Sequence, residues 1–185
     1  MSNINFDEIE KKYKDLIDIA KKYMQNIKDF EHDINHVNDV VYYTKRLIEK
    51  LDKSVINIDV CIISAYWHDV GRIKGNEGHE KLSANMLKNV MEMYNYDEAF
   101  INECYDAIEF HKWNMNPKTL EGLIIKDADK LAWIGINRWK NCIKNNYKLD
   151  EIVNLLPKLR NEILCFEESK IIYDEDICKL IKYLI

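Results

Sequence analysis

The chain has 185 residues, of which 47% are apolar and 32% are charged, so it can build one hydrophobic core but not two. Its 27 Lys and Arg against 32 Asp and Glu give a net charge of -5, which excludes a global basic field for nonspecific nucleic-acid binding. Five glycines and two prolines are too few for a loop-rich β fold. We therefore expect an all-α chain that forms a single domain over 1–185.

The cysteines and the hydropathy pattern argue against export and against a membrane span. The five cysteines are widely spaced, and none belongs to a Cys-x-x-Cys pair of the kind found in zinc and redox sites. No apolar run approaches the roughly 18 residues that a membrane helix requires. We expect a cytoplasmic protein with no membrane partner.

The first half of the chain predicts amphipathic helices around one fully apolar segment. Apolar residues at three-and-four spacing predict helices from about 7 to 27 and from about 34 to 51. In residues 60–67, VCIISAYW, periodicity does not separate a buried strand from a buried helix. We interpret this run as a helix because an isolated strand would leave its backbone groups unpaired. Gly71 is expected to end it.

The second half predicts further helices. One extends from about 77 to 94, the next is capped by Asp97, and a third is capped by Thr119 and continues to about 134. The remainder, about 137–185, is typical of three more helices, with Pro157 opening or bending one of them.

The histidines are unevenly distributed over these predicted helices. Four of the five lie at the end or on the apolar side of a helix, namely His36, His68, His79 and His111. A single histidine in such a position is more often a hydrogen-bonded core residue than a ligand. The His68-Asp69 doublet stands out, because adjacent residues diverge by about 100° on a helix and reach one ion only where the helix ends. By itself a His-Asp dipeptide is weak evidence for a metal site, and the chain contains a second one, His32-Asp33.

The surroundings of these residues carry a resemblance to a known family. His36 lies in FEHDINHVNDVVYYTKRL, the doublet lies in SAYWHDVGR and is followed by GHEKLSANML, and Asp129 lies in KDADKLAWIG. In this order the residues resemble the HD superfamily of metal-dependent phosphohydrolases, in which these four positions hold one divalent metal. The similarity covers about 30–140. It implies an HD-type helical bundle, with the helices of about 141–185 packed on that core.

The four residue types define the expected chemistry. Two neutral imidazoles and two carboxylates suit Mn, Fe, Zn, Co, Ni or Mg, with positions left open for water and substrate. A divalent ion lowers the pKa of water from about 16 towards roughly 7 and neutralises a phosphoryl oxygen. The resemblance thus implies a phosphatase, phosphodiesterase or nucleotide pyrophosphohydrolase, whose partner is a small phosphorylated substrate, in our interpretation a nucleotide. The alternative is a non-catalytic, metal-stabilised module that binds a nucleotide or a partner protein.

The roles of His79 and His111 allow two interpretations. Some HD families that bind two metals insert two further histidines between the doublet and the last aspartate, and these two occur in the corresponding order. Asp69 would then bridge both ions. We prefer one metal, with His79 and His111 lining the cleft as phosphate donors or acid-base groups.

The helix of residues 120–134 offers two aspartates. Asp127 falls within its apolar arc and Asp129 nearer the edge, so the pattern alone favours Asp127. The family ligand, however, is the aspartate of an Ala-Asp-Lys/Arg-Leu stretch, which implies Asp129 as ligand and Asp127 as the neighbour that orients it. Arg72 and Lys130 are the cations that we expect to orient phosphate oxygens and to stabilise charge in the transition state.

Overall fold

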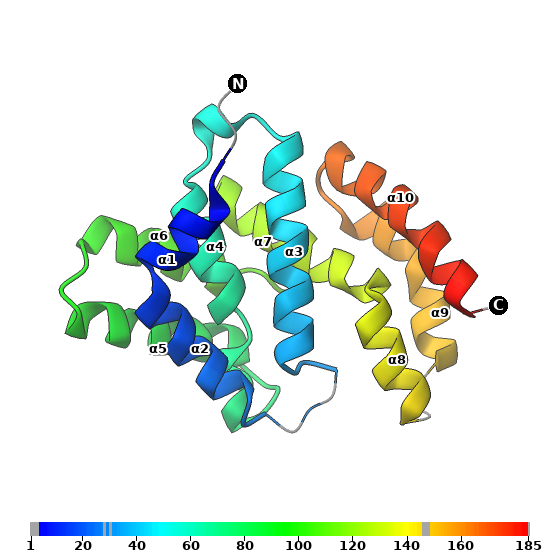
Figure 1. The fold of residues 1–185 in the computed structure, drawn as a ribbon, viewed down its shortest axis with the longest axis horizontal. Helices are drawn as coiled ribbons and strands as arrows, with labels where there is room; N and C mark the ends of the chain where they lie inside the picture. Colours follow the sequence, from blue (N-terminus) through cyan, green and yellow to red (C-terminus); the bar gives the residue numbers. More distant parts are fainter. Residues whose placement is uncertain (1–3, 28, 30, 146–148, 185) are drawn as a thin grey trace.

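The computed structural model describes residues 4–27, 29, 31–145 and 149–184. Within these ranges the chain forms α-helices, short 3₁₀ turns and one π-turn, and no strand occurs there, which confirms the all-α prediction (Figure 1). None of the helices in the described part combines the length and the apolar composition that a bilayer span needs.

Helix α4, Ile58–Trp67, lies at the centre of the core. Every side chain from Val60 to Trp67 is buried, and the indole N–H of Trp67 donates to the carbonyl of Leu16 at 3.1 Å. The apolar run is therefore a helix, as expected, and it is apolar all round because other helices cover it on every side. Those that pack against it include α3 (Ile34–Lys50), α6 (Glu98–Glu109) and α7 (Leu120–Leu131).

The single helix expected from about 7 to 27 is two helices, α1 (Phe6–Lys12) and α2 (Lys14–Met24). The break falls at Tyr13, whose backbone leaves the helical region at φ -107° and ψ 25°. The Tyr13 hydroxyl donates to Asp59 Oδ2 at 2.7 Å, and its ring stacks on Phe100. Local periodicity continues through this position, so only the tertiary partners explain the break.

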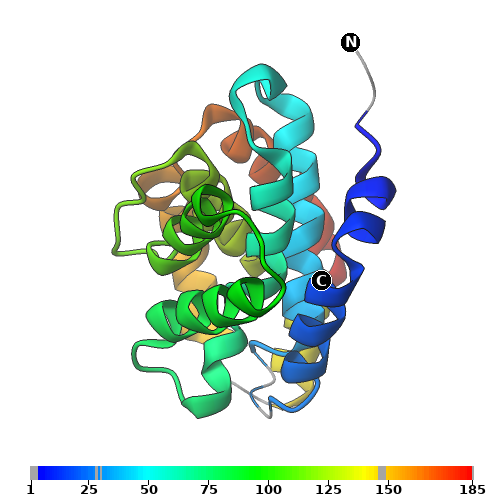
Figure 2. The ribbon, with the colours of Figure 1, turned by 90° about the vertical axis from the view of Figure 1, so that its left-hand side faces the viewer.

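Helices α5 (His79–Met93) and α6 form a hairpin that lies across the end of α4 (Figure 2). The 3₁₀ turn Val70–Lys74 connects α4 to this hairpin and packs against α5. Asp97 caps α6 by accepting the backbone N–H of Phe100, and Thr119 caps α7 by accepting that of Gly122, as predicted.

The C-terminal part contains the three helices expected from the sequence, α8 (Ile136–Lys144), α9 (Leu149–Lys158) and α10 (Glu167–Leu184). Pro157 lies in the last turn of α9, just before the π-turn Leu159–Ile163. Helix α10 packs against α3 and α7, so this group flanks the core on the side away from α1 and α2 (Figure 1).

Candidate metal centre

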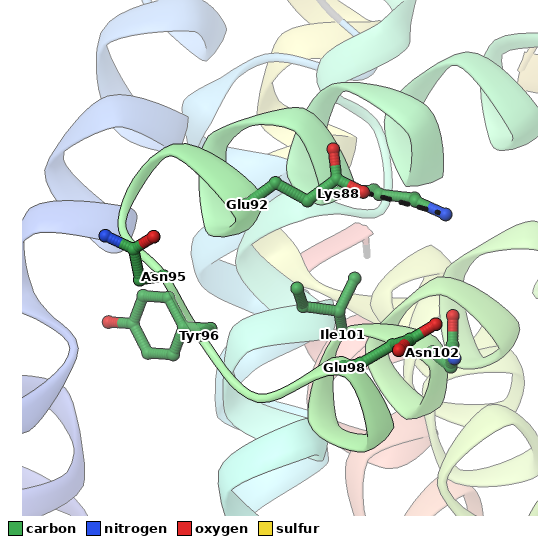
Figure 3. A pocket seen from close by; sticks show the side chains of 7 residues that line it. All are labelled: Lys88, Glu92, Asn95, Tyr96, Glu98, Ile101 and Asn102. Atoms are coloured by element: carbon green, nitrogen blue, oxygen red, sulfur yellow. Dashed lines mark ion pairs between the residues drawn. The ribbon is translucent and has the colours of Figure 1, made fainter.

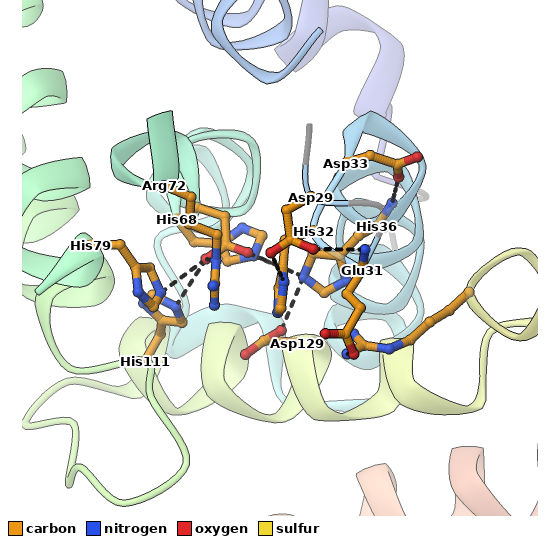
Figure 4. Close-up of polar contacts among 12 residues, drawn as sticks. Asp29, Glu31, His32, Asp33, His36, His68, Arg72, His79, His111 and Asp129 are labelled. Atoms are coloured by element: carbon orange, nitrogen blue, oxygen red, sulfur yellow. Dashed lines mark hydrogen bonds and ion pairs between the residues drawn. The ribbon is translucent and has the colours of Figure 1, made fainter. Parts of the chain in front are cut away.

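The ends of five helices meet at one buried place. The side chains that they bring together are His36 in the first turn of α3, His68 and Asp69 at the end of α4, His79 at the start of α5, His111 just after α6, and Asp129 in the last turn of α7. Figure 4 shows the four imidazoles and Asp129 directed into the same space. Residues far apart in the sequence therefore form one site.

The end of α4 allows both members of the doublet to reach this site. His68 still has helical backbone angles, φ -53° and ψ -35°, whereas Asp69, at φ -110° and ψ 3°, has left the helix. The next turn requires Gly71, because a Cβ there would lie 2.3 Å from the carbonyl oxygen of His79. The absence of that carbon lets the start of α5 lie directly against the doublet.

Three of the imidazoles are oriented in the same way. The Nδ1 of His68 lies 2.8 Å from the carbonyl of Ala65, that of His79 lies 2.8 Å from the carbonyl of Asn76, and that of His111 lies 2.7 Å from the carbonyl of Ile108. A carbonyl only accepts, so each Nδ1 carries the proton and donates it. Each Nε2 is then an unprotonated donor of an electron pair, which is the form that binds a metal.

One cluster lies between α3 and α4. The Nε2 atoms of His36 and His68 are 3.3 Å apart, and each lies 3.6 Å from Asp69 Oδ2. These three ligand atoms all lie within 4.8 Å of one another. Asp129 Oδ1 approaches the cluster through His36 Nε2, at 3.2 Å. Its other oxygen is paired with the ammonium of Lys130, the next residue.

A second cluster uses the other oxygen of Asp69. Oδ1 lies 3.1 Å from His79 Nε2 and 3.8 Å from His111 Nε2, and these three atoms again lie within 4.8 Å of one another. The Nε of Arg72 is 2.8 Å from the same oxygen. Asp69 is thus shared between two imidazole pairs, and a guanidinium already neutralises one side of it.

The electrostatics of the site fit a divalent cation. Asp69 is only 1% exposed, and within the described part of the chain neither of its oxygens accepts a hydrogen bond of normal geometry and His79 Nε2 has no hydrogen-bond partner. Burial alone would raise the pKa of Asp69, but His68, His79 and Arg72 outweigh it and hold that pKa well below its usual range. Buried acceptors that stay charged and unpaired are costly unless a cation binds them.

Burial and neighbouring charges also set the protonation states of the other candidate ligands. Burial opposes ionisation of Asp129, yet Lys130 and His36 hold its pKa well below the usual range. Burial lowers the pKa of His36 to about 4 and that of His111 to about 3, so both imidazoles are neutral at pH 7. Ionised carboxylates and neutral imidazoles are the states that bind a divalent metal.

Asp127 is not the neighbour of Asp129 that the sequence suggested. Its carboxylate faces the C-terminal segment, where it accepts the backbone N–H of Cys165 at 2.9 Å and that of Phe166 at 3.0 Å. Two positions along a helix turn a side chain by about 200°, so Asp127 and Asp129 project to nearly opposite sides of α7. Asp127 therefore anchors the segment that leads into α10, and the prediction that its carboxylate orients Asp129 is wrong.

A group of residues that the sequence reasoning passed over lies beside His36. The Nδ1 of His32 is 2.9 Å from Asp29 Oδ2, and the ring of His32 lies edge-on to that of His36, with centroids 5.4 Å apart. Glu31 joins these two in a third cluster of ligand-type atoms, which is less buried than the other two. Asp33, the other member of the His32-Asp33 dipeptide, caps α3 and accepts a hydrogen bond from the Asn141 side chain at 3.5 Å.

A pocket with a volume of about 370 Å³ lies elsewhere, between the end of α5 and the start of α6 (Figure 3). Its lining contains neither histidine nor cysteine and consists of Lys88, Glu92, Asn95, Tyr96, Glu98, Ile101 and Asn102. It lies at the opposite end of α5 from His79. It offers no set of metal ligands, so the imidazole cluster is the better candidate site.

Comparison with known proteins places this chain in a family. The HD domain family matches residues 33–134, which is more than half of the chain. No curated protein matches the sequence. Among solved structures, a predicted HD superfamily hydrolase from an uncultured Thermotogales bacterium is similar with a TM-score of 0.71 and 19% identity, over 98% of this chain and 95% of that one.

Two further structures have the same fold. Bacillus subtilis YpgQ, solved in complex with ADP, has a TM-score of 0.68 and 18% identity, over 95% of this chain and 93% of its own. A Lactobacillus plantarum protein has a TM-score of 0.65 and 15% identity, over 92% and 93%. These likenesses confirm the HD-type helical bundle. Together with the family match, they show that the chain belongs to the HD domain family.

Proposed function

We propose that this protein is a metal-dependent phosphohydrolase that cleaves a phosphate ester or phosphoanhydride of a nucleotide. The observation that carries the proposal is the convergence of His36, His68 and Asp69 in one buried cluster, in which the ionised Asp69 oxygens accept no hydrogen bond from any described residue. Membership of the HD domain family supports it. The ADP complex of YpgQ, a protein of similar fold, supports the choice of a nucleotide.

We assign the metal to His36, His68, Asp69 and Asp129. A divalent ion held there would act as a Lewis acid towards a phosphoryl oxygen and lower the pKa of water. Arg72 and Lys130 hold one carboxylate oxygen each, at Asp69 and Asp129, and so fix the direction of the remaining oxygens. Their positive charges also stabilise the negative charge that develops on a phosphate oxygen.

His111 acts as a hydrogen-bond acceptor in this proposal, not as a phosphate donor. Its Nδ1 proton is donated to the carbonyl of Ile108, and its pKa of about 3 leaves Nε2 unprotonated at neutral pH. His79 has the same arrangement, with Nδ1 directed to the carbonyl of Asn76. Both Nε2 atoms can therefore orient a water molecule beside Asp69 by accepting its proton in a hydrogen bond.

We propose one tightly held ion. A second ion at Asp69, His79 and His111 would use the oxygen that Arg72 already contacts at 2.8 Å, and two cations on one carboxylate oxygen repel each other. No Lys or Arg among the described residues pairs with Asp69 Oδ2, the oxygen that faces His36 and His68 in the first cluster. Metal analysis of the purified protein distinguishes a stoichiometry of one from a stoichiometry of two.

The test combines metal content with activity. The wild-type protein, loaded separately with Mn²⁺, Co²⁺, Ni²⁺, Zn²⁺ or Mg²⁺, is assayed against nucleoside mono-, di- and triphosphates and a simple aryl phosphate. Asp69→Asn and His68→Ala should lose metal and lose at least about 100-fold in activity, while their helical circular dichroism is unchanged. Asp59→Asn is a matched control, because Asp59 lies at the other end of α4 and pairs with Lys12 and Tyr13.

One observation favours a second function, that of a non-catalytic module in which the metal joins the helices. The ligand side chains are nearly inaccessible, and Asp129, the most exposed of them, is only 10% exposed. A structural metal would contribute folding energy without turnover. Wild type that holds metal, loses stability on chelation and hydrolyses none of the phosphate compounds would support this module and reject the enzyme.

A further inference from the structure

Arg138, which no part of the proposed mechanism uses, is a buried guanidinium next to the metal cluster. It is the third residue of α8, and its side chain is only 2% exposed. The guanidinium carbon lies 3.6 Å from the centroid of the Trp133 ring, and Trp133 follows Asp129 by four residues. Trp133 lies in the 3₁₀ turn Ala132–Ile134, which follows α7 directly, so Arg138 is held against the segment that comes straight after Asp129.

The hydrogen-bonding capacity of Arg138 is largely unused. Its Nη2 lies 3.3 Å from Glu31 Oε1, whereas Nε and Nη1 are buried and have no hydrogen-bond partner among the described residues. A guanidinium presents its N–H groups in a planar fork that fits carboxylate and phosphate oxygens. Leaving two of these donors buried and unpaired is unfavourable, which indicates that an anion completes them.

The partner of Arg138 connects it to the site. Glu31 belongs to the cluster with His32, in which the ligand-type atoms lie within 4.8 Å of one another, and the ring of His32 lies edge-on to that of His36 (Figure 4). Burial lowers the pKa of Arg138, while the negative charges of Glu31, Asp129 and Asp69 act in the opposite direction, so the guanidinium lies within the field of both ligand carboxylates. Arg138 is thus a third cation at the site, separate from Arg72 and Lys130, which are occupied by those carboxylates.

We propose that Arg138 binds a phosphate group of the substrate adjacent to the phosphoryl group at the metal cluster, and that the substrate class is therefore a compound with two or more linked phosphates. This inference rests on the proposed function and narrows it, since a monoester has only one phosphate and would leave Arg138 unpaired. Glu31 holds the guanidinium in place before the substrate arrives. As a carboxylate on the same cation, it also competes with the incoming phosphate.

Anion binding tests the inference without requiring turnover. Calorimetric titration of Mn²⁺-loaded protein uses methylenediphosphonate, a diphosphate analogue that is not hydrolysed, and methylphosphonate, which has one phosphonate group. Arg138→Gln should weaken diphosphonate binding by about 10- to 100-fold, as expected for a lost bidentate charged contact, and leave methylphosphonate binding and metal content unchanged. Arg160→Gln is the matched control, because Arg160 is an exposed arginine that pairs with Asp174.

Glu31→Gln separates this role from a purely structural one. Removing the competing carboxylate should tighten diphosphonate binding about 3-fold or more, whereas an ion pair that only supports the fold would give no gain. Arg138→Lys keeps the charge without the planar fork and should bind the diphosphonate with intermediate affinity. It also serves as the test variant if Arg138→Gln does not fold.

The outcomes distinguish this inference from the proposed function. If Arg138→Gln and Glu31→Gln both bind the diphosphonate with wild-type affinity, the role of Arg138 is overturned, even if the enzyme is active. Loss of metal from both Arg138 variants would also overturn it, because Arg138 would then only maintain the metal site. A wild-type protein without activity whose diphosphonate binding depends on Arg138 would reject the hydrolase and keep the anion site.

Discussion

Replacing Asp127 with alanine should destabilise the protein through the C-terminal helices and leave the metal site intact. The carboxylate is fully buried and accepts two backbone N–H groups, those of Cys165 and Phe166, at 2.9–3.0 Å. A hydrogen bond to a charged group contributes about 1.5–3 kcal/mol, and the alanine variant loses both of these. The carboxylate's own desolvation offsets part of this. We expect a net loss of about 3 kcal/mol for Asp127→Ala.

Urea unfolding followed by circular dichroism measures this loss, and hydrogen exchange locates it. Protection should fall first at the start of α10, while metal content stays at the wild-type value. Burial raises the pKa of Asp127, so Asp127→Asn, which removes the charge but keeps an acceptor oxygen, should cost less than the alanine variant. Asp174→Ala, at an exposed ion pair on α10, is the control. Wild-type stability in Asp127→Ala, or loss of metal before loss of protection, would refute the reasoning.

Two further predictions concern the imidazole cluster. Burial lowers the pKa of His36 from 6.5 to about 4, so between these pH values the unfolded chain binds a proton that the folded chain does not. The metal-free protein should therefore be most stable above pH 6.5 and lose about 3 kcal/mol of its free energy of unfolding as the pH falls to 4. A melting temperature that does not change with pH would contradict this. Gly71→Ala places a methyl group 2.3 Å from the carbonyl oxygen of His79 and should cost about 3 kcal/mol and lower metal affinity, which denaturation and metal titration measure.

The sequence predicts the elements that local pattern determines. Apolar spacing and caps place α3 and α7 to within a few residues, and the end of α4 at the doublet follows from the need for two neighbouring side chains to reach one ion. Periodicity does not predict the break at Tyr13, because the tyrosine leaves the helix to contact Asp59 and Phe100, which are distant in sequence.

The role of a polar residue on a buried face depends on a partner that the local sequence does not specify. The helical wheel correctly places Asp127 in the apolar arc of α7, but its partners are the backbone of residues 165 and 166. Helical spacing places Arg138 on a buried face in the same way, because it precedes the buried Cys142 by four residues on the inner face of α8. An arginine on such a face indicates a buried partner, and only the fold shows that two of its donors have none among the described residues.

In our proposals, metal binding and recognition of the adjacent phosphate by Arg138 lie on different parts of this chain. The proposed ligands fall between His36 and Asp129, inside the family match at residues 33–134, whereas Arg138 follows it on α8. Helix α7 links the two parts, because one side presents Asp129 to the metal and the other presents Asp127 to the C-terminal helices. Loosening that second contact should leave the ligands in place but shift α10, which packs against the turn Ala132–Ile134, and Trp133 of this turn stacks on Arg138. In Asp127→Asn we therefore expect diphosphonate affinity to fall while metal content remains at the wild-type value, and a parallel loss of both would show that the two parts are one unit.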